Sequence, residues 1–219
     1  MRVVLYAEGI GELGGGGGLQ PAPGSPLLDE MLGPAHVLVR RCLEAESRIP
    51  PKAIQFVSPL RIGARLAKGS DLLSRESLRR LLTFPLAERR PDLAVVLVDA
   101  DGDLSRQKML EGYVADVPLS HVIGVAIQEF ESWLVADVAA LSTALRPGFS
   151  QTPAPESLGR REAKGLLIGW VQEQSDDKAK QRELRREIAK HANLDTIAKR
   201  CGAFEDFRRA LREVSVARS

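Results

Sequence analysis

Two short apolar runs that each end in acidic residues constrain the fold of this chain more than any other feature. The first run covers residues 3–7 and is followed by Glu8, and the second covers residues 93–98 and is followed by three alternating aspartates. Continuously apolar runs of this length are typical of buried parallel strands. In open α/β sheets, ligands bind at the carboxyl ends of such strands. We therefore expect both sets of acids at one edge of a parallel sheet.

The residue types at these strand ends favour a divalent cation. Glu8, Asp99, Asp101 and Asp103 would repel one another and resist desolvation, and a bound cation relieves both penalties. Because no cysteine cluster or histidine pair accompanies them, the ligand set indicates Mg²⁺ or Mn²⁺ rather than zinc. A calcium loop is disfavoured, since the glycine at position 102 is misplaced and no glutamate occupies the twelfth position. An aspartate-rich turn without bound metal is the alternative.

A further candidate acid, Glu131, follows the run at residues 121–127. On a predicted helix Phe130, Trp133 and Leu134 share one face and should be buried, whereas Glu131 points elsewhere near the start of the helix. The helix dipole favours an anion there, so Glu131 is either a site residue or a simple capping acid. Glu129 is the weaker candidate of the two.

Strand and helix patterns alternate through the first two thirds of the chain and predict an α/β fold. The predicted strands are 3–7, 53–57, 93–98 and 121–127, and the predicted helices between them are 27–47, 71–87 and 105–113. Helices at 129–145, 156–172, 177–191 and 194–214 follow. We expect a mostly parallel four-stranded sheet with helices on both faces in residues 1–145, and a C-terminal helical extension in residues 146–219.

A glycine-rich stretch follows the first strand. It contains five consecutive glycines at 14–18 and a segment rich in Pro, Gly and Ser at 20–26. It lacks the Gly-Lys-Ser/Thr ending of a P-loop and the spacing of a dinucleotide fingerprint. A long loop beside the site, able to close over a substrate, is therefore favoured over a preformed phosphate cradle.

Composition narrows the class of protein. Aromatic residues make up 5% of the chain, which argues against a surface built to stack bases, and the net charge of +2 does not by itself indicate a nucleic-acid partner. Two cysteines far apart in the sequence exclude a disulfide framework. Because Met1 and Arg2 lead straight into a short strand, we expect no signal peptide. No run approaches the ~20 apolar residues needed to span a membrane, so we expect a cytoplasmic protein, with a homodimer as the default oligomer.

The motifs resemble a known group of proteins. The pair Glu8-Gly9 after a first strand, with Asp99-Ala100-Asp101 after a later one, resembles the Toprim pattern of topoisomerases, DnaG-type primases and OLD-family nucleases. More narrowly, segments 130–134 and 193–207 are similar to a bacterial Toprim-like family of unknown function that is related to the RloB-like proteins. This resemblance extends from residue 3 to about residue 211. It implies a Toprim-like, Rossmann-like fold.

The resemblance also implies an activity and a partner. It implies an Mg²⁺-dependent nuclease that cleaves DNA or RNA and works with an ABC/SMC-like ATPase in defence against phage. Carried onto this sequence, Glu8 would be the general base or a metal ligand, Asp99 and Asp101 would hold Mg²⁺, and Asp103 and Glu131 would support a second ion. Two ions about 4 Å apart would activate a water and stabilise the leaving oxygen.

Basic residues near the C-terminus provide weaker candidates. Related OLD enzymes use a catalytic lysine, and Lys180, or its neighbour Lys178, is the candidate by position. Lys178, Lys190, Lys199 and Arg200 could contact a nucleic-acid backbone. Because acids are interspersed with them, ordinary solvated helix faces are the alternative.

Two other functions stay open at this point. An acidic site of this kind also suits another metal-dependent phosphohydrolase or a nucleotidyl transferase. Alternatively, the chain is a non-catalytic interaction subunit of an ATPase complex, with the apolar face of the last helix as its docking surface. Burial of Phe204 and Phe207 on that face would instead make it part of the core.

Overall fold

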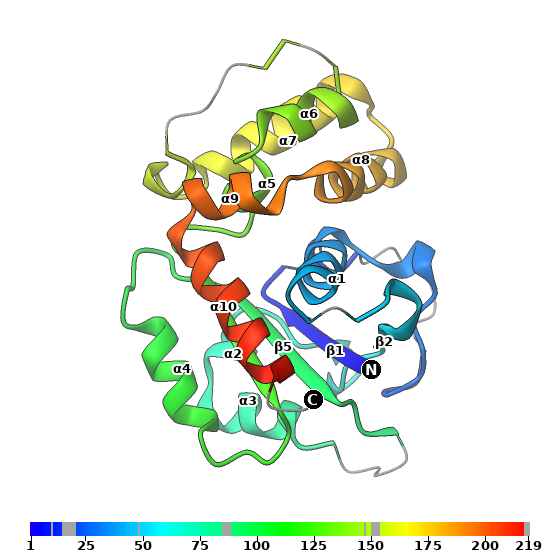
Figure 1. The fold of residues 1–219 in the computed structure, drawn as a ribbon, viewed down its shortest axis with the longest axis vertical. Coiled ribbons are helices and arrows are strands. Elements are labelled where there is room, and N and C mark those ends of the chain that lie inside the picture. Colours follow the sequence, from blue (N-terminus) through cyan, green and yellow to red (C-terminus); the bar gives the residue numbers. More distant parts are fainter. Residues whose placement is uncertain are drawn as a thin grey trace.

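The central sheet of the protein has four parallel strands (Figure 1). The structure is a computed structural model, and it describes residues 1–9, 11–14, 21–47, 49–84, 89–146, 148–149 and 154–216. They are β1 (Arg2–Ala7), β2 (Gln55–Val57), β5 (Leu93–Asp99) and β6 (His121–Ala126), in the order β2-β1-β5-β6. A short antiparallel hairpin of β3 (Arg61–Ile62) and β4 (Arg65–Leu66) lies apart from this sheet. The predicted α/β fold with a four-stranded parallel sheet is confirmed.

The two acid-ended strands are neighbours at the centre of the sheet. Ala7 of β1 is paired with Leu97 of β5, and Asp99 of β5 with Ala126 of β6. The chain continues this pairing one residue beyond β1, because the amide of Glu8 donates to the carbonyl of Leu97 at 3.1 Å. The acids therefore leave the sheet side by side at its carboxyl edge.

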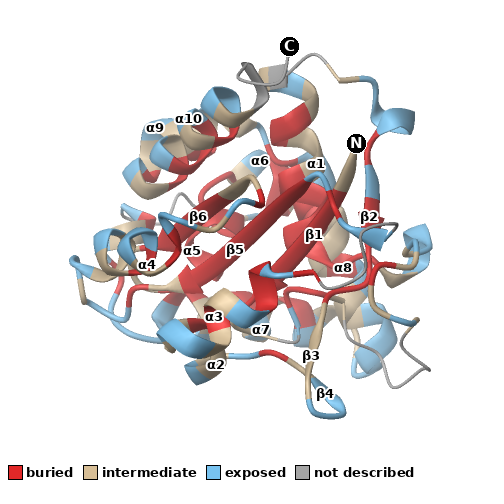
Figure 2. Ribbon diagram, turned by 90° about the horizontal axis from the view of Figure 1, so that it is seen from below, coloured by how far each residue is buried: buried red, intermediate tan, exposed pale blue. Residues whose placement is uncertain are grey.

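Helices cover both faces of the sheet because strand side chains alternate between two apolar cores. Val3, Leu5 and their counterparts on β5 pack with α1 (Pro34–Ser47) and α10 (Gly202–Val216). The intervening side chains of β1 and β5, such as Val4 and Val96, pack with the opposite layer. That layer consists of α2 (Ser70–Leu73), α3 (Arg75–Leu82) and α4 (Arg106–Val114). Figure 2 shows the buried strands enclosed between these helices.

The part of the chain that follows β6 is helical, as predicted, and shares the first of these cores. It comprises α5 (Glu131–Leu134), α6 (Val138–Ala144), α7 (Glu162–Gln174), α8 (Lys178–His191), α9 (Leu194–Arg200) and α10. In Figure 1 these helices form a layer beside α1, and α10 runs back along the sheet. Trp133 packs against Phe204 and Phe207, with ring centroids 5.1 and 5.6 Å apart. Because both phenylalanines are fully buried, this face of α10 is core and not a free docking surface.

Several predicted helices were too long because local caps interrupt them. Residues 27–47 were wrong as one helix, since α1 begins only at Pro34, a residue suited to a first helical position. Ser74 divides 71–82 by accepting from the amide of Ser77, and residues 85–87 of that prediction lie outside the described residues. Asp137 divides 129–145 by accepting from the amides of Ala139 and Ala140, which begins α6.

Three more short elements complete the description. They are the 3-10 turns Asp29–Met31, Pro51–Ala53 and Pro155–Ser157, the last lying where a helix from residue 156 was predicted. Residues 15–20 of the glycine-rich stretch lie outside the described residues.

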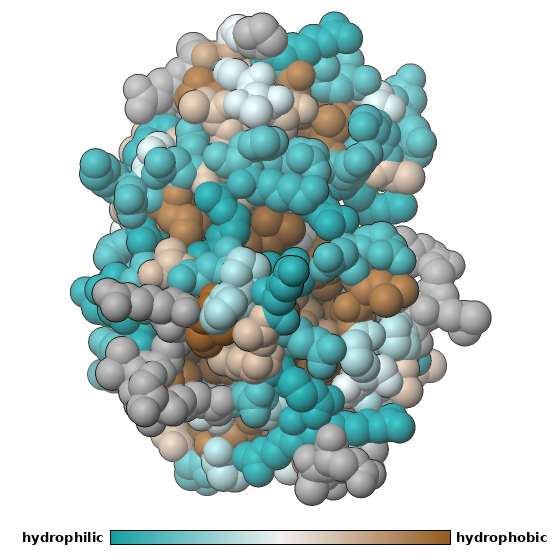
Figure 3. Space-filling model, turned by 45° about the vertical axis from the view of Figure 1, so that its right-hand side comes forward, coloured by the Kyte–Doolittle hydropathy of each residue, from teal (hydrophilic) through white to brown (hydrophobic). Residues whose placement is uncertain are grey.

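None of the helices in the described ranges combines the length and apolar composition that crossing a membrane requires. Hydrophilic side chains cover much of the face in Figure 3.

Candidate functional site

A cavity of about 440 Å³ lies at the carboxyl ends of β1 and β5. Its wall carries both signs of charge. The acidic lining residues are Glu8, Glu12, Asp99, Asp101 and Glu129, and the basic ones are Arg160, Arg161 and Lys164. We call this space the acidic cavity. It brings together four of the acids considered from sequence: Glu8, Asp99, Asp101 and the weaker candidate Glu129.

Glu8 and Asp99 form the centre of this site. The carboxylate of Glu8 accepts a hydrogen bond from the backbone amide of Asp99 at 3.0 Å, and Asp99 Oδ1 accepts one from the amide of Phe130 at 2.8 Å. Each carboxylate is thus fixed by a bond to backbone. Burial, then the charges of Glu8 and Glu131, raise the pKa of Asp99 to about 7. The site therefore concentrates more negative charge than the surrounding protein stabilises.

A second buried acid, Glu12, was not identified from the sequence. It is 3% exposed, and burial together with Asp99 and Glu131 raises its pKa well above the ordinary value. A Cβ atom at position 9 would lie 2.4 Å from Glu12 Oε1, so the glycine after Glu8 leaves the room that this carboxyl occupies. Glu12 lies in a glycine-rich turn that has no periodic pattern, and only tertiary structure places it at the site.

The other two aspartates of the β5 loop have different surroundings. Asp101 has a positive φ of 49° and lies 3.3 Å from Arg160 Nε and 3.7 Å from Arg106 Nη1. Asp103 accepts from both the amide and the hydroxyl of Ser105, at 3.0 and 2.7 Å, and these bonds lower its pKa. Asp103 lines a separate cavity, beside the start of α10. The structure therefore brings Asp101 to the acidic cavity and leaves Asp103 outside it.

Glu131 lies behind the wall of the acidic cavity and pairs with two basic side chains, Arg185 and Lys164. It is 1% exposed, with Oε1 2.7 Å from Arg185 Nη2 on α8 and 3.6 Å from Lys164 Nζ on α7. Glu129 Oε2 accepts from the backbone amide of Lys164 at 3.1 Å. The two glutamates after β6 therefore fix both the backbone and the ammonium of Lys164. Within the described residues, Glu129 Oε1 and Glu131 Oε2 have no hydrogen-bond partner.

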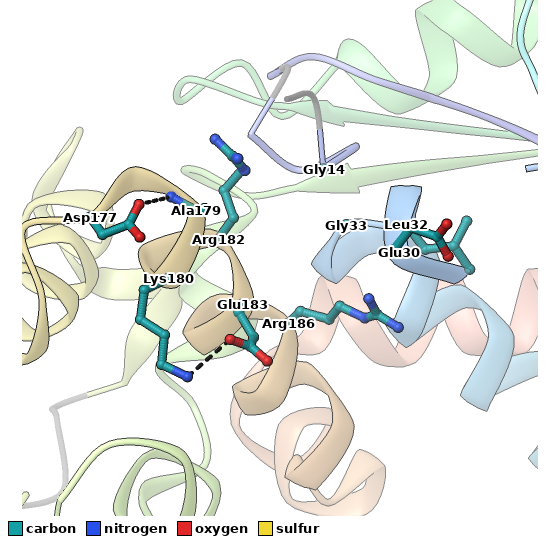
Figure 4. Close-up of a pocket in the computed structure, with 10 residues that line it drawn as sticks. All are labelled: Gly14, Glu30, Leu32, Gly33, Asp177, Ala179, Lys180, Arg182, Glu183 and Arg186. Carbon is teal, nitrogen blue, oxygen red and sulfur yellow. Dashed lines mark hydrogen bonds and ion pairs between the residues drawn. The ribbon is translucent and has the colours of Figure 1, made fainter. Parts of the chain in front are cut away.

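The lysine at the acidic cavity is Lys164, not Lys180. Lys180 pairs with Glu183 on α8 at 2.9 Å and lines a different cavity, shown in Figure 4. Lys178 donates to Gln181 on the same helix at 3.3 Å. The sequence signal for Lys164 was a set of three basic residues, Arg160, Arg161 and Lys164, at the start of α7, and this set carries no motif.

The remaining basic candidates also lie away from the acidic cavity. Lys190 pairs with Glu187 on the exposed side of α8. Lys199 lines a surface pocket beside α10, and Arg200 donates to the carbonyl of Ala136, which stabilises the packing of α9. The structure does not bring these three residues together.

The donor set fits a magnesium-type ion only with help from water or substrate. Within the described ranges, no group of three His, Cys, Asp or Glu side chains is placed to hold a metal ion alone. Mg²⁺ is nevertheless commonly held by one or two carboxylates, with waters and substrate phosphates completing its shell. Glu8 and Asp99 are two such carboxylates, on an open cavity and with a charge that a cation would neutralise.

Comparison with known proteins gives a family and no activity. A family described as "Domain of unknown function (DUF4276)" matches residues 28–212, well over half of the chain. No curated protein and no solved structure matches the chain. The family match begins after Glu8 and Glu12 and includes Asp99, Asp101, Glu129 and Lys164.

Proposed function

The chain belongs to the DUF4276 family, whose function is unknown, and we propose from its site that it is an Mg²⁺- or Mn²⁺-dependent nuclease. The observation that carries the proposal is the hydrogen-bonded pair of Glu8 and Asp99 at the carboxyl ends of two central parallel strands. The raised pKa of Asp99 supports it, because burial and the charges of Glu8 and Glu131 disfavour this carboxylate, and a divalent cation beside it would stabilise its charged form. The resemblance to Toprim-like nucleases supports phosphodiester hydrolysis as the reaction.

In this proposal four side chains of the acidic cavity contact the cation or the phosphate. Glu8 and Asp99 would hold the cation, and Asp101, now paired with Arg106 and Arg160, would be a further ligand. A bound Mg²⁺ or Mn²⁺ would polarise the scissile phosphate and lower the pKa of a water. Lys164, whose ammonium is fixed by Glu131 at 3.6 Å, adds positive charge that attracts the phosphate into an otherwise acidic space.

Proton transfer is assigned to carboxylates at the same cavity. Glu8 is either a ligand of the cation or the general base, and its place at the strand end, fixed by the amide of Asp99, suits both roles. Glu129 is the second candidate for general base, because its Oε1 has no partner among the described residues and burial raises its pKa. Asp103 and Lys180, which lie at other cavities, have no role in this version of the mechanism.

The partner and the biological role rest on the resemblance alone. They are an ABC/SMC-like ATPase partner and a part in bacterial defence against phage. A docking role for the apolar face of α10 loses support, because Phe204 and Phe207 are buried. Another metal-dependent phosphohydrolase or nucleotidyl transferase is the second candidate, favoured by the same pair of carboxylates.

Calorimetry and cleavage on the same samples test the proposal. Mn²⁺ or Mg²⁺ is titrated into wild type, the double variant Asp99→Ala/Asp101→Ala, and the control Asp116→Asn. Asp116 is an exposed aspartate paired with Arg79 on the far face of the sheet, so the control removes a carboxylate that does not line the cavity. Plasmid and transfer-RNA substrates are then incubated with each protein.

We expect metal binding and cleavage in wild type and the control, and neither in the double variant. Failure of the folded wild type to bind either ion would refute the proposal and favour a non-catalytic role. Metal binding with hydrolysis of small phosphate esters but not of nucleic acid would favour the second candidate.

A further inference from the structure

A second charged cavity, of about 420 Å³, lies between α8, the segment just before α1 and Gly14 (Figure 4). Three basic side chains of α8 line it: Lys180, Arg182 and Arg186. We call it the basic cavity. Gly14 and Gly33 also line it, so part of its wall is bare backbone.

The acids of the basic cavity are mostly committed to other partners. Asp177 caps α8 by accepting from the amide of Ala179 at 2.7 Å, and Glu183 pairs with Lys180 at 2.9 Å. Both interactions are drawn in Figure 4. The third acid, Glu30, is exposed on a 3-10 turn. The negative charge in the lining is therefore largely neutralised by its own contacts.

Two guanidinium groups in this cavity are not committed. Within the described part of the chain, Arg182 and Arg186 make no hydrogen bond and no ion pair, and Arg186 Nε is buried without a partner. In Figure 4 Arg186 extends from α8 toward the segment that contains Gly33. A partly buried guanidinium with unused donors is costly, and a phosphate is an anion whose geometry matches its fork.

Neighbouring segments of the chain line the basic cavity and the acidic cavity. Gly9 and Glu12 line the acidic cavity, and Gly14, five residues after Gly9, lines the basic one. On the helix side Arg185, next to Arg186, pairs with Glu131 behind the acidic cavity. A chain of phosphates that has one member at the acidic cavity would therefore have another within reach of α8.

We propose that Arg182 and Arg186 bind two phosphates of the substrate strand that flank the phosphate held at the acidic cavity. This inference rests on the proposed nuclease function, and it specifies the substrate as a polynucleotide strand rather than a single nucleotide. Lys180, committed to Glu183, is not required for it.

Binding without metal tests the inference separately from cleavage. Fluorescence anisotropy in EDTA measures the affinity of a labelled single-stranded 12-mer, as DNA and as RNA, over a range of salt concentrations. The proteins are wild type, Arg182→Gln, Arg182→Gln/Arg186→Gln, and the control Arg80→Gln. Arg80 is an exposed arginine on α3, across the sheet from α8, so the control removes charge without touching the cavity.

We expect the double variant to bind the 12-mer roughly tenfold more weakly and to show a salt slope smaller by about 1.4, which is the loss of two phosphate contacts. Arg182→Gln should show about half of the change in the logarithm of the affinity and about half of the change in salt slope. Arg80→Gln should match wild type in both. Equal affinity and slope in wild type and the double variant would overturn the inference, as would no binding by wild type.

A competition with ATP separates the two sources of phosphate. If ATP alone binds in an arginine-dependent way and the 12-mer does not, the ligand is a free nucleotide and the strand assignment is wrong. If the 12-mer binds through these arginines but is never cut with Mg²⁺, the proposed nuclease function fails while the phosphate site stands.

Discussion

Replacing Asp99 with asparagine is expected to stabilise the metal-free protein at pH 8, although it removes a central residue of the site. Asparagine keeps the oxygen that accepts from the amide of Phe130 at 2.8 Å and removes the charge that Glu8 and Glu131 oppose. Functional sites commonly carry such a stability cost.

The size of the effect follows from the pKa of Asp99. Its value rises from 3.8 in the unfolded chain to about 7 in the folded protein. The folded state therefore binds more protons between these values, and stability is lost as the pH rises through that window. Since each unit is worth ~1.4 kcal/mol, the wild type loses roughly 4 kcal/mol by pH 8, and the variant should recover much of it.

Urea unfolding in EDTA at pH 8 and at pH 5 measures this difference. We expect Asp99→Asn to be more stable than wild type at pH 8, and the gap to shrink at pH 5, where folded Asp99 is mostly protonated. Saturating Mg²⁺ at pH 8 should stabilise the wild type and leave the variant unchanged.

The control Asp116→Asn should behave in the opposite way. Its pairing with Arg79 lowers the pKa of Asp116 to about 2, so the charge there is favourable and its removal should not stabilise the fold. A variant at position 99 that is less stable than wild type at pH 8, or equally stabilised at both pH values, would refute the electrostatic argument.

Three further predictions concern the core and the ion pairs behind the site. His36 is buried, and burial, then the charge of Arg40, lowers its pKa to about 3, so it stays neutral in the folded protein. Its unfolded form gains a proton as the pH falls from 7.5 to 5, and wild type should therefore lose about 2 kcal/mol of unfolding free energy relative to His36→Gln in paired urea titrations. Gly124→Ala should destabilise the protein by about 1–3 kcal/mol, because the new Cβ would lie 2.6 Å from Leu97 Cδ2. The control Gly112→Ala, whose Cβ would meet open space, should be neutral or stabilising, and thermal melts compare the two variants with wild type. Glu131→Gln should cost roughly 3–5 kcal/mol by chemical denaturation, because it leaves partly buried cations unpaired; a loss below 1 kcal/mol would show that the pairs are solvated.

Sequence patterns located the strands better than the helices. The four apolar runs agree with β1, β2, β5 and β6 to within two residues, because a buried strand needs continuous apolar character whatever surrounds it. Helix ends depended on caps such as Ser74 and Asp137, each of which interrupts an otherwise continuous apolar period. A periodic apolar pattern does not reveal where one side chain caps a helix by accepting from one or two backbone amides.

The sequence by itself determined that acids follow two buried strands, and this placed Glu8, Asp99 and Asp101 at one cavity. The reason is that parallel pairing brings the carboxyl ends of neighbouring strands to the same edge. Only the tertiary structure decided which residues complete the cavity, because Glu12 and Lys164 reach it from a glycine-rich turn and from α7. Contacts between segments so distant along the chain depend on packing around the shared core, which leaves no periodic trace in either segment.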